Sequence, residues 1–127
     1  MRRFACVILL AVAACTGSVT SQPQRFIVFF QEWSAAIGPE AEKAITAAAQ
    51  YAKDHPADAV KVTGYADTTG SAAANVYMSH ARAQVVADQL ITDGVDQARI
   101  AVDAAGATGY ALSSQESRRA GIVIGGP

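Results

Sequence analysis

Residues that build disulfides, metal centres and catalytic clusters are scarce in this sequence. Its 127 residues include 2 cysteines and 2 histidines, and the histidines lack the H-x-x-H and H-E-x-x-H spacings of zinc enzymes. His80 directly follows Ser79, and adjacent residues of a helix point about 100° apart, so these two cannot form a nucleophile–base pair. We therefore expect no catalytic residue, no metal and no cofactor.

A long hydrophobic run is also missing. The apolar stretch from Phe4 to Ala14 is about half of the roughly 20 residues that a membrane-spanning helix needs, and Arg2 and Arg3 precede it. This pattern is typical of a signal peptide, which we assign to residues 1–14. Removing Arg2 and Arg3 from the 10 basic residues leaves 8 against 11 acidic ones. This acidic balance argues against a nucleic-acid partner.

The end of the apolar stretch carries a second signal. Val12-Ala13-Ala14-Cys15 resembles the lipobox of bacterial lipoproteins, which implies lipidation of Cys15 and anchoring in a membrane. An ordinary secretory signal is the alternative, because Ala11-Val12-Ala13 also fits the A-x-A pattern. That reading leaves Cys15 as a lone thiol without a disulfide partner, since Cys6 lies in the removed segment. Thr16, rather than Asp, after the cysteine favours the outer membrane by the same resemblance.

The remaining chain reads as one domain after a short linker. Residues 15–24 form the lipidated cysteine and a polar linker, which reaches about 30 Å if fully extended. Residues 25–127 form the domain. Because the signal peptide and the lipid anchor precede it, we expect this domain to lie in the periplasm. Its first element is a strand, Arg25–Phe30, whose unbroken apolar character predicts burial on both faces.

The following elements alternate between helix and strand. Gly38-Pro39-Glu40 opens a helix that ends at Asp54-His55-Pro56. Val60–Tyr65 is a strand, and a second helix runs from about Ala74 to Thr92, with Gly94 ending it. The helical core stripes are Ala41, Ile45, Ala48 and Ala52, then Ser79, Ala83, Val86 and Leu90. Strands at Arg99–Ala104 and Arg118–Ile124 flank a loop from Gly106 to Gln115. The predicted fold is an α/β sandwich, β-α-β-α-β-β, with two helices on one face of a mixed four-stranded sheet.

The region around the second predicted helix carries an ordered motif. Gly64-Tyr65-Ala66-Asp67 is followed by Thr68-Thr69-Gly70, and then by Asn75-x-x-Met78-Ser79-x-x-Arg82-Ala83 with Val86 and Leu90. Further ordered positions are Phe29-Phe30, Gly38-Pro39-Glu40-Ala41, Gly94-Val95, Arg99-Ile100, Gly106 and Ser117-Arg118-Arg119. Over about Phe26 to Ile124 this arrangement resembles the OmpA-like peptidoglycan-binding domain family.

The resemblance implies noncovalent binding of peptidoglycan without cleavage. In that family the matching Asp and Arg hold an ammonium and a carboxylate of the stem-peptide diaminopimelate, which carries over to Asp67 and Arg82. A fixed acid and an Arg fork suit those charges. Helical geometry places Arg82 beside the core stripe, in line with Asn75 and Met78. Gly70, Asn75, Met78 and Arg118 are further candidate contacts, while Ser71 fits a helix N-cap.

Several alternatives remain at this point. Asp67 and Arg82 could pair with each other or with the backbone and hold only the loop. Tyr65-Ala66 replaces the family's His-Thr, which removes a pocket hydroxyl, and Trp33 fits either the pocket mouth or a cap on the core. The second functional hypothesis is therefore an adaptor for other envelope proteins with weak or no wall binding. The first is a lipid-anchored link between outer membrane and peptidoglycan.

Overall fold

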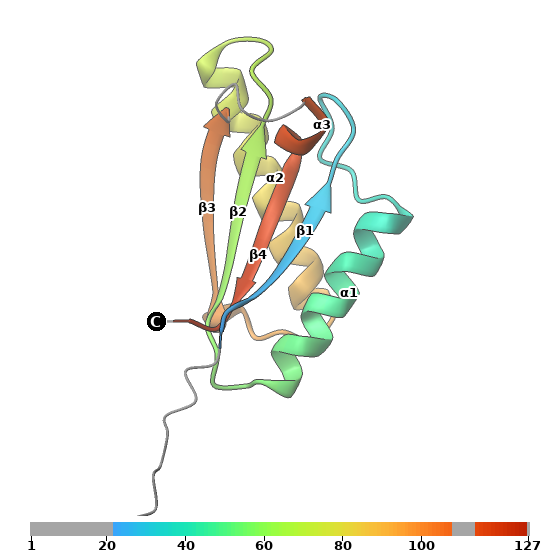
Figure 1. The fold of residues 1–127 in the computed structure, drawn as a ribbon, viewed down its shortest axis with the longest axis vertical. Coiled ribbons are helices and arrows are strands. Elements are labelled where there is room, and N and C mark those ends of the chain that lie inside the picture. Colours follow the sequence, from blue (N-terminus) through green and yellow to red (C-terminus); the bar gives the residue numbers. More distant parts are fainter. Residues whose placement is uncertain (1–21, 108–113, 127) are drawn as a thin grey trace, which may run out of the picture.

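A four-stranded sheet carries two long helices on one of its faces, and no helix of the described residues covers the other face (Figure 1). This computed structural model describes residues 22–107 and 114–126. The predicted signal peptide, Cys15 and most of the linker lie outside the described residues, as does most of the predicted loop from Gly106 to Gln115. In the part of the chain that is described, no helix is long and apolar enough to cross a membrane.

The predicted α/β class and element order are confirmed. The main elements are β1 (Gln24–Phe29), α1 (Pro39–Asp54), β2 (Val60–Ala66), α2 (Ala72–Thr92), β3 (Ile100–Ala107) and β4 (Arg119–Ile124). A 3₁₀ turn, η1 (Gln97–Arg99), precedes β3, and a short helix, α3 (Ser114–Ser117), precedes β4. The predicted loop from Gly106 to Gln115 differs at both ends, because β3 continues to Ala107 and α3 already begins at Ser114.

The strand order is β1-β4-β2-β3, with β2 parallel to β3 and β4 antiparallel to β1 and β2. Gln24 and Val60 both pair with Ile124, so the starts of β1 and β2 lie at the same end of the sheet. The opposite end gathers the ends of β1 and β2 and the start of α2 (Figure 1). We call these the entry end and the pocket end.

Local sequence explains the helix boundaries. Pro39 occupies the first turn of α1, where its missing N–H costs no hydrogen bond, and Glu40 and Glu42 lie at the positive end of the helix. Ser71 caps α2 by accepting a hydrogen bond from the Ala74 N–H at 3.1 Å, as predicted. Gly94 has a φ of 102°, which suits its place just after α2.

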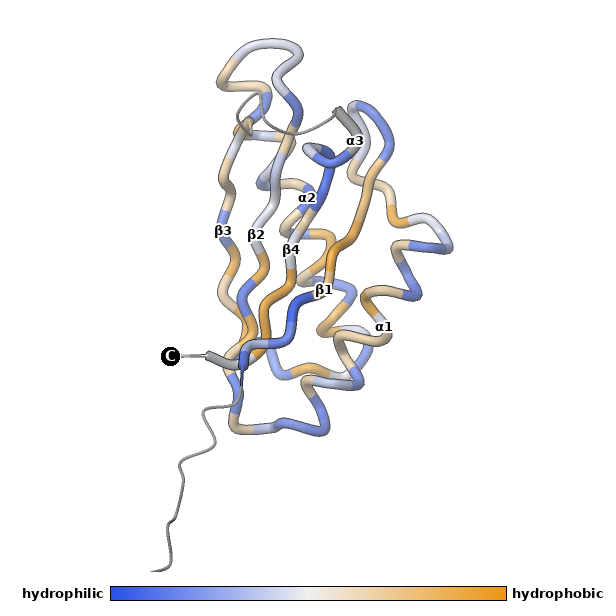
Figure 2. Tube along the Cα trace, in the orientation of Figure 1, coloured by the Kyte–Doolittle hydropathy of each residue, from blue (hydrophilic) through white to orange (hydrophobic). Residues whose placement is uncertain are grey.

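The hydrophobic core lies between the helices and the sheet. Both predicted helical stripes are buried, and they pack against strand residues that include Val28, Val62 and Ile122. In Figure 2 the strongest hydrophobic colours lie on parts of β1 and β4, whereas the tip of the loop after β1 and the region of α3 are hydrophilic.

The prediction that β1 is buried on both faces is wrong. Val28 is fully buried, but Ile27 and Phe29 are 51% and 46% exposed. The physical reason is that both helices cover the same face of the sheet, and β1 is an edge strand. Alternate apolar residues of β1 therefore face solvent.

Close contact between α2 and β2 depends on Gly64. A Cβ added at this position would lie 1.8 Å from the backbone oxygen of Ser79, so a larger residue would force the helix away from the strand. The Ser79 hydroxyl also accepts a hydrogen bond from the Gly106 N–H at 3.0 Å, which ties α2 to β3. These contacts fix the start of α2 against the end of β2.

Candidate functional site

A small hollow at the pocket end collects most of the side chains predicted to bind a ligand. It is lined by Trp33, Ala66, Asp67, Asn75, Met78 and Arg82, and its volume is about 10 Å³. The loop after β1, the end of β2 and the first turns of α2 each supply part of this wall. The structure thus brings together Asp67, Asn75, Met78 and Arg82, which the sequence analysis had singled out.

Asp67 is fixed at the end of β2 with 8% of its surface exposed. Its Oδ1 accepts hydrogen bonds from the Thr69 N–H at 3.0 Å and from the Thr69 hydroxyl. Its Oδ2 lies 3.9 Å from Nη1 of Arg118, the outer limit of an ion pair. The carboxylate is thereby oriented by its own loop and lies among positive groups.

Arg82 is almost fully buried, with 1% of its surface exposed. Its guanidinium donates three hydrogen bonds to backbone oxygens, from Nε to Ser34 at 2.9 Å, from Nη1 to Tyr65 at 3.0 Å and from Nη2 to Gln31 at 3.0 Å. Besides lying beside the core stripe, Arg82 is itself buried, and its side chain closes the core at the pocket end. A guanidinium has more N–H groups than these bonds use.

The surroundings of Arg82 shift the pKa of its guanidinium. Burial lowers the pKa of the guanidinium from its ordinary value, while the Asp67 carboxylate raises it and Arg118 lowers it further. An arginine pKa starts so high that the group stays protonated in water. The hollow therefore contains one permanent cation beside one carboxylate, both shielded from solvent.

Asn75 adds a polar side chain to the wall of the hollow. This residue is 3% exposed and lines the hollow. Its amide group can both donate and accept hydrogen bonds, so it can bond to a charged group of either sign.

The remaining candidates lie around this hollow. Gly70 contacts Trp33, since a Cβ added to Gly70 would lie 2.6 Å from Cη2 of the indole. Arg118 donates from Nε to the Phe30 oxygen at 3.3 Å, besides approaching Asp67. The next residue, Arg119, lies over the Tyr65 ring at 4.2 Å, on the uncovered face of the sheet.

Ala66 occupies the pocket wall where the related motif has a hydroxyl. Trp33 lines the same wall and is 50% exposed, which places it at the mouth rather than in the core. The sequence signal for Trp33 was only its position after β1, and that position suited either role.

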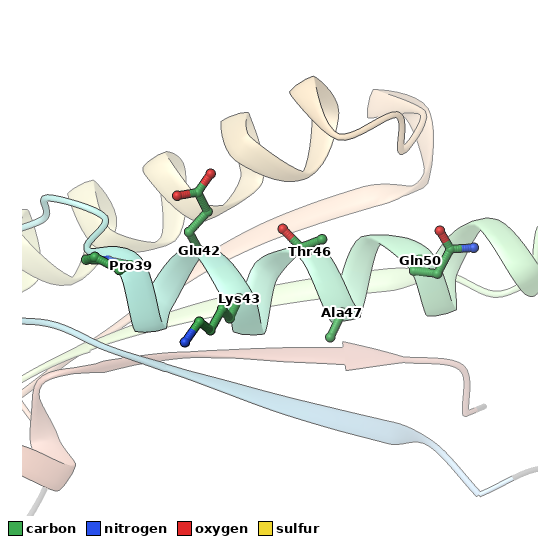
Figure 3. Close-up of a pocket in the computed structure, with 6 residues that line it drawn as sticks. All are labelled: Pro39, Glu42, Lys43, Thr46, Ala47 and Gln50. Atoms are coloured by element: carbon green, nitrogen blue, oxygen red, sulfur yellow. The ribbon is translucent and has the colours of Figure 1, made fainter.

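A larger hollow lies elsewhere, on the outer side of α1 (Figure 3). It has a volume of about 610 Å³, and all of its lining residues come from that helix: Pro39, Glu42, Lys43, Thr46, Ala47 and Gln50. Because a single helix borders it, the hollow is an open helix surface without buried polar groups. The small hollow at the pocket end is the better candidate for a binding site.

The chemistry at the pocket end is that of binding. A carboxylate, a guanidinium and an amide in a shielded place can hold a zwitterion by charge-assisted hydrogen bonds. His80 is exposed on α2, and the Ser79 hydroxyl donates to the Val76 oxygen at 2.8 Å. Across the described residues, no group of three or more His, Cys, Asp or Glu side chains is placed to hold a metal ion.

Fold and pocket together define an α/β domain with two helices on one face of a mixed sheet and a polar hollow at the pocket end. Residues 29–120 match the OmpA family, and this chain belongs to that family. OmpA-like domains are structural peptidoglycan-binding modules and not enzymes, and this holds for the domain at residues 29–120.

Individual relatives agree with this assignment. The chain is 42% identical over 73 residues to the probable lipoprotein YiaD of Escherichia coli, covering 58% of this chain and 33% of that protein. It is 41% identical over 78 residues to outer membrane protein 40 of Porphyromonas gingivalis, covering 61% and 20%. Thus the matching part spans a third or less of each relative's length.

A solved structure shows the same fold. The peptidoglycan-associated lipoprotein of Burkholderia pseudomallei superposes with a TM-score of 0.73 at 26% identity, covering 78% of this chain and 89% of that one. These relatives are lipoproteins or outer-membrane proteins, which indicates a place in the cell envelope for this chain as well.

Proposed function

We propose that this protein binds peptidoglycan noncovalently through the diaminopimelate of the stem peptide, and that a lipid on Cys15 anchors it in the outer membrane. The observation that carries the proposal is the convergence of Asp67, Asn75 and Arg82 on one hollow, each less than a tenth exposed. Buried charged and polar groups contribute little net stability to a fold. A ligand that carries both charges can form charge-assisted hydrogen bonds with them.

Diaminopimelate matches these groups in charge. Its free end carries an ammonium and a carboxylate on one carbon, and the side chain that leads to this end is flexible. The carboxylate suits the remaining N–H groups of Arg82, and the ammonium suits Asp67. The Asn75 amide can both donate and accept, so it can bond to either group.

The placement of the pocket fits an anchored protein. The described chain begins at Gln22, beside the start of β1 at the entry end (Figure 1). The residues that line the pocket belong to the opposite end of the sheet. A six-residue strand separates these ends by about 20 Å. A membrane anchor on the N-terminal side would leave the pocket facing away from the membrane.

Lipidation of Cys15 is a separate part of the proposal. Two or more acyl chains hold a protein stably in a bilayer, because each buried CH2 contributes about 0.8 kcal/mol. A single pocket for a small charged group binds weakly, but many copies on one membrane facing one polymer bind firmly together. The intact mass of the membrane-extracted protein tests the lipid directly.

Sedimentation with purified diaminopimelate-containing sacculi tests wall binding. The chain from Thr16 to Pro127 retains the whole described core and is compared with Asp67→Asn and Asp103→Asn. Asp103 is an exposed residue of β3, so its variant controls for the same change of charge. We expect the parent and Asp103→Asn to sediment with sacculi and Asp67→Asn to remain in solution. A folded parent that stays in solution would contradict the proposal.

An adaptor for another envelope protein is the second candidate. It is favoured by the uncovered sheet face, where Ile27 and Phe29 border a hollow of about 260 Å³ with Glu116 and Arg119. This function predicts that Asp67→Asn retains activity in cells while charged substitutions at Ile27 and Phe29 abolish it. The wall-binding function predicts the reverse.

A further inference from the structure

Trp33 forms the exposed wall of the pocket. Its indole reaches from the loop after β1 to the loop after β2, where it lies against the α-carbon of Gly70. The other five lining residues belong to β2, the position just after it, or α2, and four of them are less than a tenth exposed. Trp33, by contrast, is 50% exposed. It is therefore the wall that can move with the least disruption of packing.

The backbone at Trp33 is unusual for such a large residue. The Ser34 N–H donates to the Gln31 oxygen at 3.2 Å, which closes a turn with Trp33 in its third position. Among the described residues, Trp33 is the only residue other than glycine with a positive φ, and its φ is 50°. That position normally takes glycine or asparagine, so the turn retains a bulky residue at a conformational cost.

Arg82 holds this turn in place. Nε donates to the Ser34 oxygen and Nη2 to the Gln31 oxygen, so one guanidinium bonds to both ends of the turn that carries Trp33. The same guanidinium is the group that we propose for the ligand carboxylate. Ligand binding and the position of Trp33 are therefore connected through one side chain.

The volume of the hollow shows why the connection matters. About 10 Å³ is room for roughly one water molecule, far less than an amino-acid side chain. Entry of diaminopimelate therefore requires one wall to move outward. The indole can then return over the ligand and bury its methylene chain, since an aromatic ring provides a large apolar surface.

We infer that Trp33 is a movable cover of the pocket and a positioning residue for the stem peptide: it swings out to admit diaminopimelate and then packs on the ligand's methylene groups. This inference rests on the proposed function. It assigns to Trp33 a role in how fast the ligand enters and how long it stays.

The test uses the fact that the chain contains one tryptophan. A diaminopimelate tetrapeptide is titrated into the chain from Thr16 to Pro127, with calorimetry measuring binding and fluorescence reporting on Trp33. We expect binding to shift the emission. We also expect Trp33→Gly to speed both association and dissociation of a dye-labelled tetrapeptide. The dissociation rate should increase by a factor about tenfold larger than the association rate does.

Two further variants make the result specific. Trp33→Phe keeps an aromatic cover and should retain rates near those of the parent. Tyr77→Ala removes a 75% exposed aromatic residue from α2 that does not line the pocket, and it should leave both rates unchanged. Circular dichroism confirms that each variant is folded.

Two outcomes overturn the inference and separate it from the proposed function. Calorimetric binding with unchanged emission, and unchanged rates in a folded Trp33→Gly, would refute the cover while leaving wall binding intact. A folded parent that gives no binding heat would refute both.

Discussion

The buried face of helix α2 differs between its two halves. Leu90, in the C-terminal half near the entry end, is 0% exposed and belongs to the apolar core. Arg82, about two turns earlier, is 1% exposed, but its charged group bonds to backbone oxygens of two other segments. Equal burial on one helix thus serves two kinds of contact.

The difference shows which half of the helix is built for stability. Burying a leucine side chain contributes about 1.5–3 kcal/mol. Burying a charge costs free energy that hydrogen bonds only partly return, so a buried polar cluster is weak support for a fold. We therefore propose that binding, rather than packing, explains the residues at the pocket end.

Leu90→Ala is the strongest way to disturb the apolar half. The change removes a fully buried side chain and should lower the free energy of unfolding by about 2–5 kcal/mol. Urea denaturation measures the loss. The folded fraction should bind sacculi like the parent, and a selective loss of binding would contradict the division between the two halves.

Arg82→Ala tests the polar half. The substitution leaves three backbone oxygens without their donor and should cost about 1–3 kcal/mol of stability, besides abolishing wall binding. Arg82→Lys keeps the charge but loses the planar fork, so it should restore little of either property. Denaturation and sedimentation with sacculi measure the two effects separately. Full binding by Arg82→Ala would remove this residue from the site.

Asp67→Asn sharpens the comparison by separating binding from stability. The amide oxygen can still accept the hydrogen bonds from Thr69, so stability should change by less than about 1 kcal/mol. The lost negative charge should weaken binding of the diaminopimelate ammonium by about tenfold or more. A large loss of stability with unchanged binding would mean that Asp67 only holds the loop.

Lys43→Ala should have the smallest effect. Lys43 and Glu40 form an ion pair at 3.0 Å on the outer side of α1, with side chains 74% and 87% exposed. Such pairs contribute about 0–1 kcal/mol, and salt screens them. Thermal unfolding should shift little, and wall binding should not change. A binding defect here would point to the hollow along α1 shown in Figure 3.

Much of this fold could be predicted from the sequence because helical periodicity is a local signal. The stripes from Ala41 to Ala52 and from Ser79 to Leu90 are buried as predicted, and Ser71 caps α2. The exposure of Ile27 was not predictable in the same way. It depends on both helices covering one face, which is a property of the whole sheet.

The candidate site shows the same limit. The resemblance to the OmpA-like family predicted that Asp67 and Arg82 belong to one site, and both line the hollow at the pocket end. The bonds from Arg82 to Gln31 and Ser34 join residues 51 and 48 positions apart, and no local pattern specifies such contacts. The place of Trp33 over the pocket depends on those contacts, so only the structure could decide it.

The most direct measurement is a calorimetric titration of the parent domain with two stem tetrapeptides, one containing diaminopimelate and one containing lysine at the same position. Lysine carries the ammonium but lacks the terminal carboxylate that we assign to Arg82. The account predicts binding of the diaminopimelate peptide and affinity at least about tenfold lower for the lysine peptide. Equal affinity for both, or binding of neither by a folded domain, would contradict it.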